Sequence, residues 1–177
     1  MEVSSPPQSS QPSHVPVTAE RPEHAIAVET LADLAFGPDR LRKTTYRLRD
    51  GVDPVEALSL VVMDGVHLLG TIRYWPVDIP GVASALLLGP IAIHPDHQGC
   101  GIGSALMTTS LQKAKDLGWD AVILVGDEPY YRRFGFRREL AQNLSLPGPV
   151  EQARLLGLEL TDGTLKNAAG LVGRAEG

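Results

Sequence analysis

Runs of apolar residues, separated by turn-forming residues, divide the chain into predicted strands and helices. Apolar and β-branched clusters predict strands over 15–18, 57–63, 66–75, 82–93, 121–125 and 153–160. Asp64-Gly65 lies between the second and third of these and predicts a type I′ hairpin turn. Pro90 interrupts the long strand, and because proline cannot donate a ladder hydrogen bond, we expect a bulge at Gly89-Pro90. Such a bulge would splay the sheet and free the backbone groups of Ile91, Ala92 and Ile93 from strand pairing.

Apolar residues at helical spacing predict helices between these strands. The first helix begins at Pro22 and ends before Gly37, and its buried face is expected to hold Ile26, Leu31, Leu34 and Ala35. The second covers 39–49. The third follows a glycine cluster and ends at Gly118, with a predicted buried stripe of Ile102, Ala105, Leu106, Leu111, Ala114 and Leu117.

A short helix capped by Asp127 is expected to carry three aromatic residues. Tyr130 and Phe134 are four residues apart and share a face, whereas Tyr131 points about a quarter turn away. The segment beyond 163 shows no clear pattern.

The second predicted helix carries a basic face, formed by Arg40, Arg42, Lys43, Arg47 and Arg49. A solvated face is the favoured interpretation, because charged side chains at helical spacing usually face water. The alternative is a basic border that attracts an acceptor bearing a carboxylate or a phosphate.

Composition excludes several classes of protein. The 177 residues fit one domain, which we assign to 15–177, and 1–14 is rich in Ser, Pro and Gln, which predicts a disordered tail. A net charge of −5 argues against a nucleic-acid partner. The apolar runs are too short to span a membrane, and Cys100 is the only cysteine, so a cytoplasmic protein is expected. A homodimer is left open.

The centre of the chain is the glycine cluster Gln98-Gly99-Cys100-Gly101-Ile102-Gly103, which opens the third helix. Unpaired N–H groups and the positive end of the helix dipole make such a turn a site for a phosphorylated ligand. The P-loop pattern requires a lysine after its last glycine, and none follows Gly103. The dinucleotide pattern G-x-G-x-x-G does not match the spacing G-x-G-x-G either.

The remaining pattern, [Gln/Arg]-x-x-Gly-x-[Gly/Ala], resembles the pyrophosphate loop of the GNAT superfamily of acyl-CoA N-acyltransferases. Upstream, the segment 89–95 resembles the core strand of that family and its exit turn, and downstream 130–136 resembles its tyrosine helix and Gly-Phe turn. The resemblance covers about residues 15–160. It implies an α/β fold with a mixed, mostly antiparallel central sheet that is splayed between the fourth and fifth strands and flanked by helices.

The resemblance also implies acetyl-CoA as acyl donor and no metal. The main chain of Ile91, Ala92 and Ile93 would bind the pantetheine arm. The pyrophosphate would be bound by Gln98, Gly99, Cys100, Gly101, Ile102, Gly103 and Ser104. Cys100 is interpreted as contributing its main-chain N–H, because a thiolate would repel the phosphates.

Tyr131 is the candidate catalytic residue, since it lies four residues before Gly135 as the tyrosine of the family does. A phenol with a pKa of about 10 stays protonated at neutral pH and can protonate the departing sulfur. No general base is assigned: 82–93 contains no ionisable residue, and His67, His94 and His97 are more typical of structural or solvated positions. Leu124 stands where the family has an asparagine.

The predicted function is direct transfer of an acetyl group from acetyl-CoA to a primary amine, either a small molecule or a protein amino group. Two alternatives stay open. One is an acyl-CoA-binding sensor without turnover, which the absent base favours, and the other is an acyltransferase that uses a longer acyl-CoA.

Overall fold

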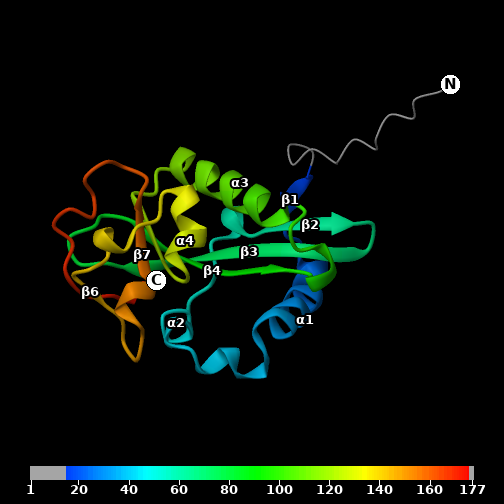
Figure 1. The fold of residues 1–177 in the computed structure, drawn as a ribbon, viewed down its shortest axis with the longest axis horizontal. Coiled ribbons are helices and arrows are strands. Elements are labelled where there is room, and N and C mark those ends of the chain that lie inside the picture. The colour runs from blue at the N-terminus through cyan, green and yellow to red at the C-terminus, as the bar shows by residue number, and fades with distance from the viewer. Residues whose placement is uncertain (1–14, 176–177) are drawn as a thin grey trace.

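A computed structural model describes residues 15–175, and its centre is a seven-stranded sheet (Figure 1). The strand order is β1-β2-β3-β4-β5-β7, with β9 pairing to β3 beside this path. All neighbours are antiparallel except β4 and β5, which confirms the mixed, mostly antiparallel sheet. The strands are β1 Val17–Ala19, β2 Leu60–Asp64, β3 His67–Asp78, β4 Ala85–Ile93, β5 Ala121–Val125, β7 Leu155–Glu159 and β9 Gly173–Arg174. A second sheet pairs β6 Leu144–Ser145 with β8 Gly170–Leu171.

Helices cover both faces of the large sheet. Figure 1 shows α3, Ile102–Asp116, on one side and α1, Ala25–Phe36, with α2, Thr44–Arg47, on the other. The short helix α4, Glu128–Tyr131, follows β5. None of the helices between residues 15 and 175 is long and apolar enough to cross a membrane. The predicted tail, 1–14, lies outside the described residues.

Alternation along β2 explains how one sheet supports two apolar layers. Leu60 and Val62 point to the side of α3, where they pack with Leu106 and Met107, and Val61 points to the side of α1. Successive side chains of a strand face opposite sides, so each layer receives every second residue. The sheet is therefore buried on both faces beneath α1 and α3.

The buried face of α1 differs from the prediction. Val28, Leu31 and Ala32 are buried, whereas Ile26 is 83% exposed and Leu34 is 58% exposed. Positions 26 and 28 are about 200° apart around a helix, so burial of Val28 turns Ile26 to solvent.

The stripe of α3 is only partly as predicted. Met107 and Ser110 are buried in addition to the expected leucines, and Leu117, at the end of the helix, is 53% exposed. Ser110 is tolerated in the core because its hydroxyl lies 2.6 Å from the hydroxyl of buried Tyr74.

The single helix predicted over 39–49 is wrong. A 3-10 helix, Pro38–Arg42, is separated from α2 by Lys43, whose φ of −65° and ψ of 144° are extended. The solvated basic face is also wrong for Arg40, which is 6% exposed. Its guanidinium binds the carboxylates of Glu29 and Asp33, the latter at 2.8 Å, and these contacts with α1 outweigh local helical spacing.

The hairpin between β2 and β3 is shifted by one residue from the prediction. Asp64 pairs with His67, so Gly65-Val66 forms the two-residue loop, and a register shift occurs between Val62 and Met63. A type I′ turn needs positive φ at both loop residues, and Val66 does not have it. The strand predicted from 57 begins at Leu60 because Glu56–Leu58 forms a 3-10 turn.

A bulge occurs in β4 as predicted. Ile72 pairs with Ile91 and Tyr74 pairs with Leu88, so Gly89 and Pro90 together oppose Arg73. The prediction that the bulge frees these residues from strand pairing is wrong for one edge of β4, however, because Ile91, Ala92 and Ile93 still pair with β3. Only their other edge is free, since β4 and β5 pair from Ala85↔Ala121 to Leu87↔Ile123 and then part. The splay between the fourth and fifth strands is thus confirmed.

Candidate active site

The N-terminus of α3 is built from glycines with left-handed backbone. Gly101 is the N-cap residue with a φ of 83°, and Gly99 has a φ of 79°. Residues with a Cβ rarely adopt this conformation, so glycine lets the chain turn sharply into the helix. The turn presents main-chain N–H groups of a fifteen-residue helix to its surroundings.

A groove of about 790 Å³ connects this helix end to the free edge of β4. All ten residues predicted to bind the donor line it: Ile91, Ala92, Ile93, Gln98, Gly99, Cys100, Gly101, Ile102, Gly103 and Ser104. Tyr130, on α4, forms another wall of the groove. Its hydroxyl oxygen lies so near Gly103 that a Cβ added there would be 2.9 Å from it. The structure therefore brings the two sequence segments, 91–93 and 98–104, to one groove.

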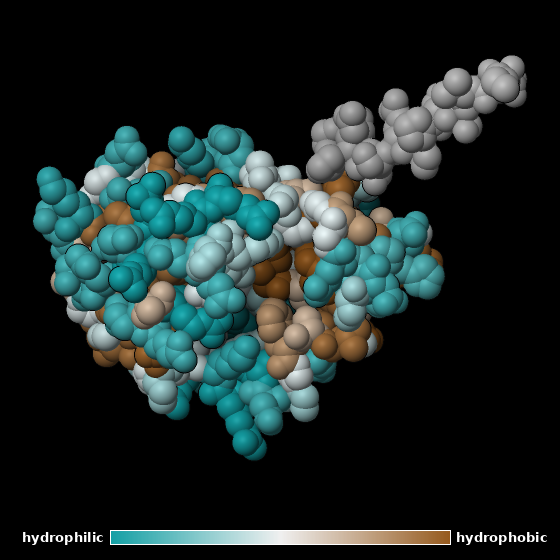
Figure 2. All heavy atoms as spheres, viewed as in Figure 1, coloured by the Kyte–Doolittle hydropathy of each residue, from teal (hydrophilic) through white to brown (hydrophobic). Residues whose placement is uncertain are grey.

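A second cavity of about 310 Å³ continues from the groove, and Phe36, Ile91 and Tyr131 border both. Its walls come from the end of α1, the basic segment 40–49, the bulge of β4, the end of β5, the last residue of α4 and the loop 149–154. Figure 2 shows a hollow near the middle of this face, with hydrophobic residues inside it, hydrophilic residues to its left and right, and hydrophobic residues below it. We call this space the acceptor cavity.

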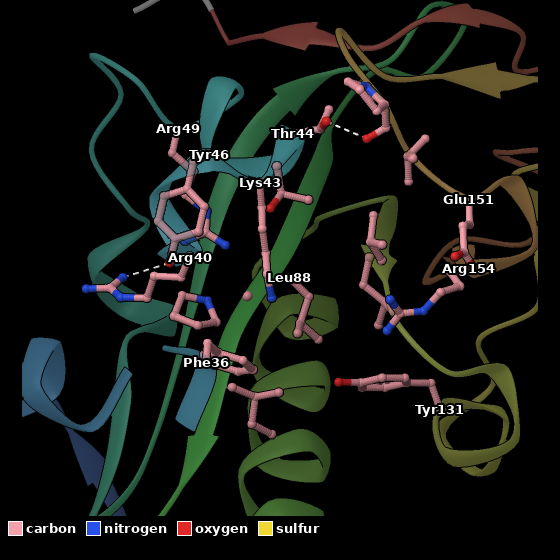
Figure 3. A pocket seen from close by; sticks show the side chains of 18 residues that line it. Phe36, Arg40, Lys43, Thr44, Tyr46, Arg49, Leu88, Tyr131, Glu151 and Arg154 are labelled. Carbon is pink, nitrogen blue, oxygen red and sulfur yellow. Dashed lines mark hydrogen bonds between the residues drawn. The ribbon is translucent and has the colours of Figure 1, made fainter. Parts of the chain in front are cut away.

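Tyr131 projects its hydroxyl into the acceptor cavity (Figure 3). Its ring packs edge-on against Tyr130, with ring centroids 4.8 Å apart, and against Phe136 at 6.1 Å. Burial, helped by the nearby Tyr130 and Asp127, raises the pKa of Tyr131 to about 12. The phenol is therefore held in its neutral, proton-bearing form.

None of the three histidines considered from the sequence borders the acceptor cavity. His97 lines the groove near the glycine turn, His94 accepts a hydrogen bond from the main-chain N–H of Asp96, and His67 pairs with Asp64 in the hairpin. Among the described residues that line the cavity, Glu151 is the only carboxylate. Sequence reasoning missed Glu151, because nothing near it in the chain signals that its loop is joined to Thr44 and Arg47.

The loop 147–151 is attached to the basic segment across the cavity. The hydroxyl of Thr44 donates to the carbonyl of Pro149, as Figure 3 shows, and Arg47 donates to the carbonyl of Pro147 at 2.7 Å. These bonds join residues about one hundred positions apart in sequence. Thr44 and Pro149 both line the acceptor cavity, so the first of these bonds lies in its wall.

Cys100 and Leu124 take different positions around these spaces. Cys100 is exposed and lines the groove, but not the acceptor cavity. Leu124 is buried in β5 and lines the cavity. No group of His, Cys, Asp and Glu suited to holding a metal occurs within 15–175.

A split sheet with a glycine-built helix end at one side of the split is the arrangement of a CoA-thioester transferase fold, and comparisons with known proteins agree. The sequence model of the acetyltransferase (GNAT) domain matches residues 56–138. The chain is 27% identical to the uncharacterized N-acetyltransferase YhbS of Escherichia coli strain K12, over 88% of this chain and 93% of that protein.

Two solved structures extend the similarity. The crystal structure of E. coli YhbS in complex with CoA matches 91% of this chain and 89% of its own, with a TM-score of 0.76 and 27% identity. A GNAT family acetyltransferase from Brucella melitensis in complex with acetyl-CoA is 30% identical, covers 80% of this chain and 94% of its own, and has a TM-score of 0.57. The chain belongs to the GNAT family of N-acetyltransferases.

Proposed function

We propose that this protein binds acetyl-CoA in the groove and transfers the acetyl group directly to a primary amine in the acceptor cavity. The observation that carries the proposal is the parting of β4 and β5 after Leu87↔Ile123, which leaves a main-chain edge leading to the N-terminus of α3. The CoA and acetyl-CoA complexes of the two similar proteins support it.

The glycine turn fits the pyrophosphate end of the donor. Main-chain N–H groups of 99–104 offer charge-assisted hydrogen bonds worth about 1.5 to 3 kcal/mol each, and the helix dipole adds about 0.3 to 1 kcal/mol. The nearest part of the groove contains no acidic residue among its described lining. An anionic ligand therefore meets donors without a competing negative charge.

The free edge of β4 fits the pantetheine arm. Ile91, Ala92 and Ile93 use one edge for β3, so outward N–H and C=O groups on the other edge are available to an amide-containing chain. A main-chain N–H near Ile91 is placed to stabilise the oxyanion that develops on the acetyl carbonyl.

Acetyl-CoA supplies the acyl group as a thioester, and two side chains of the acceptor cavity would manage the protons. We assign Tyr131 as the donor to the sulfur as the C–S bond breaks. We assign Glu151 as the base that takes a proton from the amine as the C–N bond forms. Deprotonating an amine of pKa about 10.4 at pH 7 costs about 4 to 5 kcal/mol, so a base that accepts this proton would accelerate the reaction. Exchange with water restores both groups.

Two measurements test the proposal. Isothermal titration with CoA and acetyl-CoA should give saturable binding, and a thiol-release assay with a panel of primary amines should show acceptor-dependent formation of CoA. Binding without release for any amine would favour the sensor alternative. A folded protein that binds neither compound would contradict the proposal.

A further inference from the structure

The acceptor cavity contains more positive charge than the fold neutralises. Four basic residues that line it differ in their partners. Arg40 is neutralised by Glu29 and Asp33, and the Nε of Arg154 lies 3.4 Å from a carboxylate oxygen of Asp127. Lys43 and Arg49 form no ion pair with any described residue.

Arg49 is held rigidly despite the missing ion pair. Its guanidinium carbon lies 3.9 Å from the centroid of the Tyr46 ring and 4.5 Å from that of Trp75, so two aromatic faces fix its plane. Its Nε is buried and has no hydrogen-bond partner among the described residues. A Cβ added to Gly89 would lie 3.3 Å from Nη2, so the glycine of the bulge leaves room for the guanidinium.

A guanidinium in this position has unused capacity for an anion. Aromatic faces attract its charge but accept none of its five N–H donors in the plane. Burial of a cation without a carboxylate is costly, and this burial lowers the pKa of Arg49. An oxyanion group entering the cavity would satisfy these donors, and Arg suits this role because its planar fork matches carboxylate and phosphate.

Lys43 adds a second positive charge to the same space. Its Nζ lies 5.0 Å from the ring centroid of Phe36, and Figure 3 shows its side chain running into the cavity. Glu151 and Arg154 lie on the opposite wall in this view, with Tyr131 below them. The cavity thus has one wall suited to an anion and another wall that carries the assigned base.

We propose that the acceptor is a small amine that also carries a carboxylate or phosphate group, which Arg49 and Lys43 bind while the amine faces Glu151 and Tyr131. This inference rests on the proposed function and names its substrate class. The small size follows from the cavity volume of about 310 Å³, near the lower end for ligand pockets.

The test compares acceptors that differ only in the anionic group. Acetyl-CoA binding by titration and thiol release with at least one primary amine are established first, which separates failure of the proposed function from failure of this inference. Thiol release is then measured for phenylalanine against 2-phenylethylamine, methionine against 3-(methylthio)propylamine, and phosphoethanolamine against ethanolamine. We expect the member with the anionic group to have, in at least one pair, a KM at least about tenfold lower than the member that lacks it, and the productive pair distinguishes carboxylate from phosphate.

Variants connect the preference to its residues. Arg49→Met should raise the KM of the member with the anionic group about tenfold. It should leave the KM of the member without that group, and the affinity for acetyl-CoA, nearly unchanged. Arg49→Lys should restore part of the preference, since it keeps the charge. Arg42→Met is the matched control, because Arg42 is exposed, belongs to the same basic segment and does not line the cavity.

Several outcomes would overturn the inference. They are equal or better use of every member that lacks the anionic group, an equal loss for both members of a pair in Arg49→Met, and no turnover of any pair by a protein that acetylates other primary amines.

Discussion

At the scale of single residues, Tyr131 links the sequence pattern to the chemistry. Its position before Gly135 suggested a role, and the structure places its hydroxyl in the acceptor cavity with a pKa raised to about 12. A raised pKa means that the phenol holds its proton at any pH at which an amine is assayed. It would serve as a donor and would be ineffective as a base.

Replacing Tyr131 by Phe should lower kcat by about 10²-fold or more while leaving acetyl-CoA affinity nearly unchanged, because the variant removes only the proton donor. The check is steady-state kinetics together with titration of acetyl-CoA. Tyr130→Phe is the comparison variant: its hydroxyl lies beside Gly103 in the groove, so we expect any effect on donor affinity instead of on kcat. An unchanged kcat in Tyr131→Phe would remove Tyr131 from the mechanism.

Replacing Glu151 by Gln should lower kcat by about 10²-fold at neutral pH, since the amide keeps the shape but cannot accept the proton. The deficit should shrink at higher pH, where more of the amine is already deprotonated in solution. Rates measured from pH 7 to 10 check this, with Glu139→Gln as control, because Glu139 is exposed and does not line the cavity. A deficit that is the same at every pH would contradict the role of base.

Residues of the site divide into those that local sequence reveals and those that it does not. The glycine turn and Tyr131 were predicted because each depends on its immediate neighbours in the chain. Glu151 was not singled out, because its loop is joined to Thr44 across about one hundred positions. Arg49 was predicted only as one member of a basic face, because its aromatic partner Trp75 and the adjacent Gly89 lie on β3 and β4. The buried Ser110 escaped for the same reason, since its partner Tyr74 lies on β3.

At the scale of elements, the start of α3 combines a structural requirement with the proposed binding role. Gly101→Ala places a Cβ on a residue with a φ of 83°, which should reduce the free energy of unfolding by about 1 to 2 kcal/mol. It should also weaken acetyl-CoA binding, since the same turn presents the N–H donors.

Gly118→Ala is the matched control at the other end of α3. Gly118 has a φ of 92° and open space around it, so the strain is similar, but it does not line the groove. Urea unfolding should show comparable losses for both variants, and titration should show weaker binding for Gly101→Ala alone. Equal affinities for acetyl-CoA would contradict the assignment of the turn.

Elements were predicted well where the cause is local and poorly where it is not. Pro90 alone revealed the bulge in β4, and Gly37 marked the end of α1. The prediction of a single helix over 39–49 was wrong because ion pairs between Arg40 and α1 determine the path of this segment. The segment after 163 gave no pattern, yet Leu165, Ala168 and Val172 are buried in a second apolar cluster, and β9 pairs with β3.

At the scale of the whole molecule, the phenols of Tyr74 and Tyr131 should lower the free energy of unfolding at alkaline pH. Burial raises the pKa of Tyr74 as well as that of Tyr131. Below about pH 10 both are protonated in folded and unfolded chains, and their contribution is fully present. Above it the unfolded chain loses protons first, so the free energy of unfolding falls as pH rises towards the folded pKa values.

For Tyr131 the shift from 10.0 to about 12 corresponds to a loss on the order of 2 kcal/mol. Urea unfolding at pH 8 and pH 11 should show a lower free energy of unfolding at pH 11, with a smaller fall in Tyr131→Phe, whose ring does not titrate. Equal values at both pH values for the unaltered protein would contradict the buried, protonated state of these phenols.

The groove and the acceptor cavity share only Phe36, Ile91 and Tyr131 among their described lining residues. We therefore expect the donor to occupy the groove and the acceptor to occupy the cavity, with the two meeting beside these three shared residues. Under the proposed function a ternary complex would form there, and the described lining of the acceptor cavity contains no cysteine that could carry the acyl group. A double-headed compound, joining the CoA sulfur to an anionic amine, would occupy the groove and the cavity at once and should inhibit more strongly than either half.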